Sequence, residues 1–487
     1  MERVLKDNTL KALSWSFVQE IVQRVLQFGV GVMLARMLAP AAFGLVAMLS
    51  VIFAVAQVIL ESGFAAALIQ RKQPTDTDES SVFYFNILIS LILASALWLA
   101  APAVARFYNQ PVLEPMMRVF MLVLVINAFT VVQSALLIRR LDFKQQAIIV
   151  AAGIGISGVI GLALAWRGFG VWSLVAQQVT NSLVRACLLW ALSPWRPKWL
   201  FSVRSLREMF AFGSGMLASG LLRTTSESVL PLLIGKLFSV SELGYYNRAQ
   251  TMQVIAAESL GTVAGRVTFP VFSGLQEEMG ALRSALRKAI TTIAFVQFPV
   301  LIGLACVAKP LVLLMLTEKW VPCVPYLQLL CLVGLLYPVH LLNLNVTLAI
   351  GRSDLNFRLA VIKQISTVLT ILLTFHWGII AMIWGLVFQN IFAYFLNAHY
   401  GGRLIGYPIR DQFQDFCPYL IASGLMGLGA YAVGLFFSHP WPTLLAQAFV
   451  GAVIYLSICR ILRLSAFAEI RREVWALTPF LKAGLAN

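Results

Sequence analysis

Charged residues are scarce in this sequence, and their scarcity argues against a soluble protein. Only 12% of the 487 residues are charged, whereas 60% are hydrophobic, and the mean hydropathy is +0.83. A chain of this length would normally form several soluble domains, but so few polar residues cannot cover their surfaces. We therefore expect lipid to be the main solvent of the chain.

Residues that support catalysis or metal binding are also few. The six cysteines lie almost wholly in apolar runs without paired spacing, and the four histidines are scattered. Spacing therefore predicts no disulfide framework, no zinc site and no Ser–His–acid set. The sequence also lacks a nucleotide-binding loop of the form GxxxxGK[ST]. We predict no catalytic residues, no metal, no cofactor and no direct use of ATP, and we do not expect an enzyme.

Long apolar runs are what the sequence has in abundance. Each is roughly 18 to 25 residues long, which suffices for a helix to cross about 30 Å of hydrocarbon. Strands of a membrane barrel would be shorter and would alternate in polarity. The runs therefore predict an all-α polytopic membrane protein with fourteen transmembrane helices. The predicted spans are 13–34, 42–61, 82–104, 116–137, 146–166, 170–191, 210–234, 249–270, 290–316, 325–349, 359–376, 378–398, 417–438 and 442–462.

The net charge of +16 is explained by its placement between these spans. With the N-terminus inside, 25 of the 37 Lys and Arg residues fall in inside segments, 7 in outside loops and 5 within spans. This asymmetry is the positive-inside bias, and it predicts that both termini are cytoplasmic. The charge therefore gives no reason to expect a nucleic-acid partner. The first apolar run lacks a small-residue cleavage site after it, so we expect it to be retained.

Two parts of the sequence match each other at nearly constant offsets. A shift of 200 residues places Arg36 on Lys236 and Gly44 on Gly244. A shift of 212 matches six further positions across two spans, among them Trp172 on Trp384 and Gln177 on Gln389. Matched loop charges and tryptophans at one offset indicate a duplication.

Each repeat contains six helices, an even number, so both repeats enter the membrane from the same side. They are therefore expected to be parallel repeats, followed by two additional helices, with the substrate site in the cavity between the repeats. The predicted domains are an N-terminal six-helix bundle (1–198), a C-terminal six-helix bundle (199–404) and two further helices with a cytoplasmic tail (405–487).

A family resemblance follows from these features. Two six-helix repeats, two extra helices, the early stretch LARMLAPAAFGLVAM and the later stretch ELGYYNRAQ resemble the polysaccharide-exporter branch of the multidrug, oligosaccharidyl-lipid and polysaccharide superfamily, close to the colanic-acid-type exporters. The resemblance implies a flippase in the bacterial inner membrane that moves an undecaprenyl-pyrophosphate-linked oligosaccharide to the outer leaflet. It also implies membrane lipid as a partner, and possible contact with a polysaccharide polymerase and export machinery.

Several charged residues lie inside the predicted spans, where a lone charge costs roughly 2.5 to 3.5 kcal/mol on insertion scales. Arginine suits a pyrophosphate because its planar fork binds phosphate oxygens bidentately and keeps its charge in a dry site. We therefore predict a substrate site that contains three arginines and two glutamines of the first span. These residues are Arg24, Arg223, Arg266, Gln23 and Gln27.

Carboxylates near these arginines are candidates for coupling transport to a proton or sodium gradient. Glu20 lies one helical turn from Arg24, and Glu227 lies one turn from Arg223. Glu258, in the same predicted span as Arg266, is the third candidate. The alternative interpretation is that each carboxylate only neutralises the neighbouring arginine.

Two other functions remain open at this stage. A cation-coupled multidrug exporter of the same superfamily would be expected to have an apolar, acid-lined pocket. A membrane-bound polysaccharide polymerase or ligase would need a large outer loop with catalytic residues, and the outer loops here are short.

Overall fold

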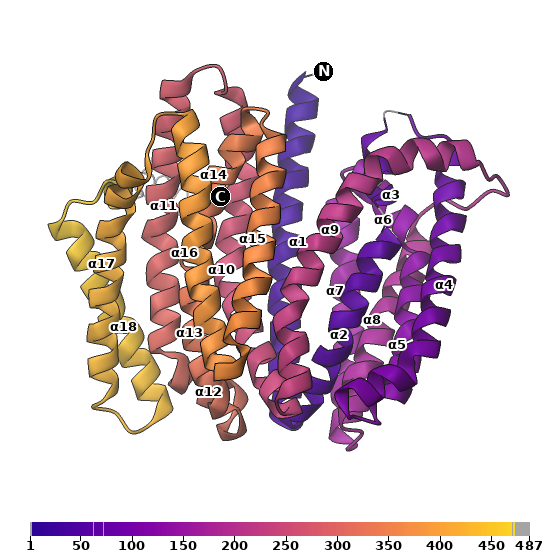
Figure 1. Cartoon of the computed structure of the whole chain (residues 1–487), viewed down its shortest axis with the longest axis horizontal. Helices are drawn as coiled ribbons and strands as arrows, with labels where there is room; N and C mark the ends of the chain where they lie inside the picture. The colour runs from indigo at the N-terminus through magenta and orange to yellow at the C-terminus, as the bar shows by residue number, and fades with distance from the viewer. Residues whose placement is uncertain (1, 62, 72, 470, 473–487) are drawn as a thin grey trace, which may run out of the picture. The chain divides into compact units, whose positions relative to one another are not determined.

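The computed structural model describes the backbone of residues 2–61, 63–71, 73–469 and 471–472. It describes the side chains of these residues except for 2–14, 16–18, 211–212 and 258–267. All secondary structure in this part of the chain is helical, with no strand (Figure 1). The prediction of an all-α protein is therefore confirmed. The chain divides into two compact units, Met1–Asn247 and Arg248–Asn487.

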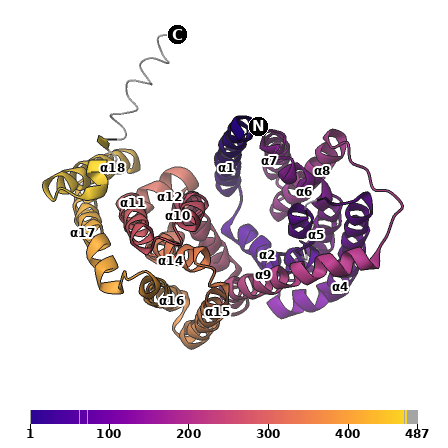
Figure 2. The same cartoon turned by 90° about the horizontal axis from the view of Figure 1, so that it is seen from above.

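The described residues of the first unit form nine helices and the beginning of a tenth. They are α1 (Glu2–Met37), α2 (Pro40–Glu61), α3 (Phe64–Gln70), α4 (Asp76–Tyr108), α5 (Leu113–Ala128), α6 (Val131–Arg139), α7 (Phe143–Trp166), α8 (Val171–Leu192), α9 (Val203–Leu237) and the first residues of α10 (Val240–Gly274). Helix α7 lies between α1 and α8 (Figure 2), while α9 packs against α2, α3 and α4.

The second unit contains the rest of α10 and all later helices. They are α11 (Met279–Cys306), α12 (Ala308–Leu316), the 3₁₀ helix η1 (Glu318–Cys323), α13 (Val324–Gly334), α14 (Tyr337–Ala349), α15 (Ser353–Thr374), η2 (Phe375–Trp377), α16 (Ile379–Leu404), α17 (Ile409–Gly434) and α18 (Pro440–Ile461). Helix α17 packs against α11 and α18, and α16 packs against α13, α14 and α15.

Nine helical segments of the described chain are long and apolar enough to cross a membrane. A tenth arises if α5 and α6, which are bent by 42° at their junction, are counted as one span. This content makes the chain a multi-pass membrane protein. Four further predicted spans, in α1, α8, α9 and α10, are helical but are not among these ten. The total of fourteen spans therefore stays a prediction.

Polar residues begin several helices and explain where they start. The Thr75 hydroxyl accepts from the Asp78 backbone N–H at 3.3 Å, and the Asp78 carboxylate accepts from the Thr75 N–H at 2.9 Å. This reciprocal capping box satisfies two backbone donors that the first turn of α4 leaves without helical partners. Asp142 caps α7 in a similar way, by accepting from Gln145 N–H at 3.0 Å.

A polar contact in the second unit joins α11, the loop before α17, and α17 itself. The Tyr407 hydroxyl, in the loop between α16 and α17, donates to Asp415 at 2.6 Å, and Arg287 of α11 contacts the same carboxylate at 2.6 Å. Burial, together with this carboxylate, raises the pKa of Tyr407 above its ordinary value. The contact links α11 to the start of α17, the first of the two helices predicted to follow the repeat.

Candidate functional site

The predicted site residues of the first span form an ion pair along α1. Arg24 contacts the Oε1 atom of Glu20 through Nε at 2.9 Å and through Nη2 at 2.8 Å. The Arg24 side chain is 21% exposed and that of Glu20 is 37% exposed. Gln23 is partly buried and Gln27 is exposed on the same helix. Spacing of three and four residues places these four side chains on one stripe of α1.

The second predicted pair lies on α9, in the same compact unit. Arg223 Nη1 is 3.4 Å from Glu227 Oε1, and the two side chains are 65% and 61% exposed. Thr224 and Ser226, the residues next to Arg223 and Glu227 in the sequence, are buried. The Arg223 pair is therefore longer and more open than the Arg24 pair, and an exposed pair of this kind contributes little to stability.

The third predicted arginine is in α10, together with its candidate coupling partner. Arg266 and Glu258 belong to that helix, but their side chains lie outside the described residues.

A polar chain between α2 and α5 joins residues that the sequence showed only as separate polar positions. The Gln57 side-chain amide donates to Glu61 at 3.2 Å, and Asn127 donates to Gln57 at 3.4 Å. Asn127 lies directly before the bend between α5 and α6. The bond between Asn127 and Gln57 connects spans that are 70 residues apart, which explains why no local pattern reveals it.

The two remaining span arginines also contact neighbouring side chains or helices. Arg118 pairs with Glu114 at 2.7 Å and lies over the Trp98 ring at 4.7 Å. Arg185 packs on α7, since a Cβ atom added at Gly153 would lie 2.8 Å from Arg185 Cγ.

A polar cluster in the second unit was missed by sequence reasoning, which treated Lys363 as an inside-loop charge. Lys363 lies ten residues after the first residue of α15, or about 15 Å along the helix axis. Gln389 of α16 donates to the Lys363 carbonyl at 3.0 Å and to Ser366 Oγ at 2.7 Å. Nearby contacts include Asn397 Nδ2, which is 3.3 Å from His340 Nδ1.

Arg248 is a further residue that the sequence assigned to a loop and the structure places in a helix. It counted as an outside-loop charge, but it lies within α10, is 6% exposed and has its guanidinium 5.7 Å from the centre of the Trp320 ring. Both residues belong to the second unit. The sequence did contain a signal for this placement. Arg248 lies near the end of ELGYYNRAQ, a stretch that runs without a break into the next apolar run.

Metal ligands do not cluster in the part of the chain that the structure describes. No group of three or more His, Cys, Asp or Glu side chains there could hold a metal ion. The polar groups that do converge are ion pairs and amides, which can bind an anion or sugar hydroxyls through hydrogen bonds.

Two solved membrane transporters share the fold of this chain. The lipid II flippase MurJ, solved in an inward closed conformation, superposes with a TM-score of 0.77 at 14% identity, covering 92% of this chain and 98% of that chain. An inward-facing MATE family multidrug resistance transporter of the MOP superfamily superposes with a TM-score of 0.60 at 15% identity, covering 79% and 94%. The chain thus has the fold shared by these transporters.

Sequence comparison identifies the family. Residues 33–325 match the family model described as polysaccharide biosynthesis protein. The teichuronic acid biosynthesis protein TuaB of Bacillus subtilis (strain 168) is 26% identical over 397 residues, 79% of this chain and 80% of that protein. The lipopolysaccharide biosynthesis protein WzxC of Escherichia coli (strain K12) is 26% identical, covering 74% and 73%, and the succinoglycan biosynthesis transport protein ExoT of Rhizobium meliloti (strain 1021) is 26% identical, covering 73% and 72%.

The chain therefore belongs to the polysaccharide biosynthesis protein family. This confirms the resemblance inferred from LARMLAPAAFGLVAM and ELGYYNRAQ, both of which lie inside the matched residues.

Proposed function

We propose that this protein is a flippase that moves an undecaprenyl-pyrophosphate-linked oligosaccharide across the bacterial inner membrane by alternating access. The observation that carries the proposal is the family match over residues 33–325, in a chain with the fold of a lipid II flippase. The relatives named for teichuronic acid, lipopolysaccharide and succinoglycan biosynthesis support a cell-surface polysaccharide precursor as the substrate class. These relatives also support a transport function without enzymatic chemistry.

In this proposal Arg24 binds the pyrophosphate, with Arg223 and Arg266 as further partners. Arg24 is the best-supported of the three because its side chain is mostly buried and its fork is already oriented by Glu20. A buried charge-assisted hydrogen bond to phosphate is about twice as strong as a neutral one. Gln23 and Gln27, on the same stripe of α1, would offer amide donors and acceptors to the first sugars.

Coupling to an ion gradient would act through the carboxylates. Glu20 contacts Arg24 at 2.8 Å, so the proposed pyrophosphate and the coupling carboxylate would share one arginine. Substrate binding and ion binding would then be linked at this pair. Glu227 and Glu258 are the corresponding candidates beside Arg223 and Arg266.

The architecture that accompanies this proposal has fourteen spans, arranged as two parallel six-helix repeats (1–198 and 199–404) and two further helices with a tail (405–487). Both termini would be cytoplasmic. A reciprocal contact in the first unit supports the repeat. A Cβ atom added at Gly44 would lie 1.9 Å from the Val240 carbonyl oxygen, and one added at Gly244 would lie 2.1 Å from that of Pro40.

The four residues of this contact are related by the 200-residue offset, with Gly44 matching Gly244 and Pro40 matching Val240. Each glycine faces the residue that corresponds to the other glycine's partner, and such a reciprocal contact indicates two-fold symmetry. It therefore supports a two-fold relation between the beginnings of α2 and α10.

The proposal is tested by complementing a strain that lacks its own exporter. Arg24→Ala, Arg223→Ala and Arg266→Ala should each remove a contact worth roughly 1.5 to 3 kcal/mol, or about tenfold to a hundredfold in affinity. Surface polysaccharide should fall sharply at normal levels of membrane protein. Arg118→Ala is the matched control, because Arg118 pairs with Glu114 and covers Trp98, and it should retain export.

Near-normal export by all three alanine variants would reject the pyrophosphate site. If the unmodified protein confers resistance to cationic drugs and has no effect on surface polysaccharide, the flippase proposal is wrong and a multidrug exporter takes its place.

A further inference from the structure

The segment that joins α8 to α9, together with the first residue of α9, has several exposed apolar side chains. Trp199 is 93% exposed, Val203 70%, Phe201 56% and Leu200 41%. Basic residues flank them on both sides, and these are Arg196, Lys198, Arg204 and Arg207, all exposed. An exposed apolar run with basic flanks calls for a partner that offers hydrocarbon and negative charge together.

Hydrogen bonds fix this segment to the beginning of α4. The backbone N–H of Lys198 donates to Ser80 Oγ at 3.0 Å, and that of Ser202 donates to Ser81 Oγ at 2.8 Å. Both serines are fully buried. Trp195, before the exposed run, is buried in an aromatic cluster with its ring 5.7 Å from that of Phe83. The exposed side chains therefore project from a backbone that is held at several points.

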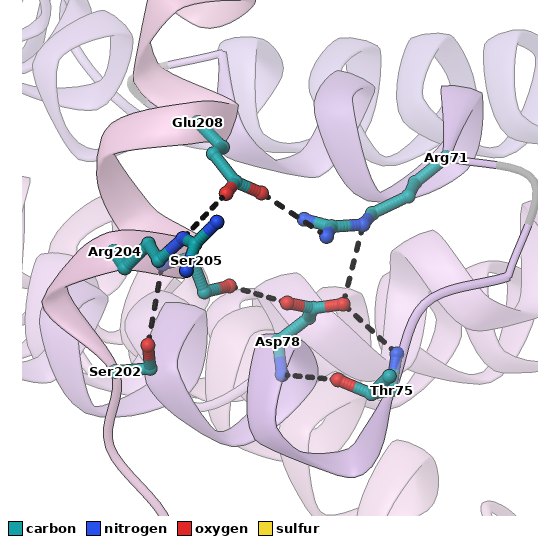
Figure 3. Close-up of polar contacts among 7 residues, drawn as sticks. All are labelled: Arg71, Thr75, Asp78, Ser202, Arg204, Ser205 and Glu208. Carbon is teal, nitrogen blue, oxygen red and sulfur yellow. Dashed lines mark hydrogen bonds and ion pairs between the residues drawn. The ribbon is translucent and has the colours of Figure 1, made fainter.

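A polar network holds the first turn of α9 to the same place (Figure 3). Ser202 caps α9 by accepting from Ser205 N–H at 3.3 Å, and the Ser205 hydroxyl donates to the buried carboxylate of Asp78. Arg71 lies 3.3 Å from both Asp78 and Glu208. Removal of Asp78 would leave the buried Ser205 hydroxyl without this acceptor.

Two neighbouring side chains of the segment point in opposite directions along α4. The Lys198 ammonium contacts Asp76, the first residue of α4, at 2.5 Å. The Trp199 ring stacks on Tyr84, with centroids 5.8 Å apart and planes inclined by 22°. Tyr84 lies eight residues after Asp76, or about 12 Å along the helix axis. The amine is thus directed to the end of a membrane span and the indole toward its interior.

We propose that residues 199–203 form an interfacial anchor that inserts Trp199, Leu200, Phe201 and Val203 into the membrane. The flanking Arg204 and Arg207 bind anionic phospholipid headgroups of the same leaflet. Tryptophan and tyrosine favour this depth because one end of the ring system is apolar and the other can hydrogen bond. The Arg204 side chain is 91% exposed although its Nε lies 3.2 Å from Glu208, and Arg207 is exposed as well. Together they supply charge that complements an anionic lipid.

The consequence is that the beginning of α9 is fixed to the bilayer surface. This helix carries Arg223 twenty residues after its first residue. The anchor would set the depth at which α9 enters the membrane, whatever substrate the protein moves.

The lipid contact is tested on the purified full-length protein in detergent by native mass spectrometry with phosphatidylglycerol or phosphatidylcholine. We expect preferential retention of phosphatidylglycerol, reduced about tenfold in affinity by the double variant Arg204→Ala with Arg207→Ala. The matched control is Arg352→Ala, another exposed arginine that pairs with a neighbouring carboxylate. Equal retention of both lipids, or an equal loss in the control, would overturn the headgroup contact.

Insertion is tested in liposomes by placing a fluorescent thiol label at Trp199→Cys in a background where the exposed Cys187 is replaced by Ser. Nitroxide lipids should quench the label, and aqueous iodide should not. If iodide quenches it as strongly as a label at the exposed Ser438, the segment faces water and a soluble partner replaces the membrane as its occupant. If the labelled variant fails to fold, a Trp199→Ser with Phe201→Ser variant should still show weaker lipid-induced thermal stabilisation than Phe436→Ser.

Discussion

In the proposed substrate site, Arg24 would bind phosphate while it keeps Glu20 as its counter-ion. Nε and Nη2 both point to a single oxygen of Glu20. A guanidinium has five N–H donors, so the Nη1 edge remains for phosphate while the pair persists. Arg223 is in a different position, because its longer contact to Glu227 and its exposed side chain leave it less oriented.

This difference predicts unequal effects of lysine at the two positions. Arg24→Lys should reduce export about tenfold, because one ammonium cannot hold Glu20 and phosphate together in a half-buried site. Arg223→Lys should keep most of the export, because an exposed position mainly requires the charge. Surface polysaccharide at matched protein levels measures both. Equal losses at the two positions would contradict the argument.

The three candidate coupling carboxylates lead to a second prediction at the scale of single residues. If one of them couples transport to the ion gradient, replacing it with Gln should make export insensitive to a gradient-collapsing agent, or abolish export. The variants are Glu20→Gln, Glu227→Gln and Glu258→Gln, and Glu114→Gln, at the structural pair with Arg118, is the control. Normal export with unchanged sensitivity in all three variants would show that none of them carries the coupling ion.

At the scale of helices, the beginnings of α2 and α10 approach each other so closely that only glycine fits at Gly44 and Gly244. The added methyl group of an alanine would meet backbone carbonyl oxygens at 1.9 and 2.1 Å. A flexible side chain could move away, but a backbone carbonyl cannot move unless the helix itself shifts.

Gly44→Ala and Gly244→Ala should therefore each destabilise the protein by about 1 to 3 kcal/mol. The double variant should cost less than the sum, because both methyl groups act on one contact that the first already opens. Thermal unfolding in detergent measures this. Gly424→Ala in α17, where a Cβ atom would meet nothing within 4 Å, should be neutral or slightly stabilising. Additive losses would argue against a single shared contact.

At the scale of the whole molecule, the orientation in the membrane follows from the Lys and Arg asymmetry. The segment that contains Arg204 should be cytoplasmic, and the turn between α17 and α18 should be outside.

Single cysteines at Arg204→Cys and Ser438→Cys are suitable probes of this orientation, because both positions are exposed. In intact cells an impermeant thiol reagent should label position 438 and not position 204, and permeabilised cells should show label at both. Labelling of 204 but not 438 in intact cells would invert the topology. Labelling of both in intact cells would mean that the number of spans between them is even.

The sequence alone determined the class of this protein, since hydropathy and charge are properties of short stretches. Runs such as 146–166 and 442–462 predict helices that the structure contains as α7 and α18. The one-turn spacing of Glu20 and Arg24 predicts their contact, because a helix fixes the separation of such neighbours. The stretch ELGYYNRAQ indicated the family because a motif, like hydropathy, is a property of a short stretch of sequence.

Only the tertiary structure decided which distant residues meet. The bond between Asn127 and Gln57 spans 70 residues, the contact between Arg71 and Glu208 spans 137, and the Ser80 bond to the Lys198 backbone spans 118. The sequence assigned Lys363 and Arg248 to loops, whereas they lie in helices α15 and α10. A charge near the end of an apolar run can belong to the loop or to the helix. Helix packing settles such cases, since it decides which polar groups find partners in a solvent that offers them none.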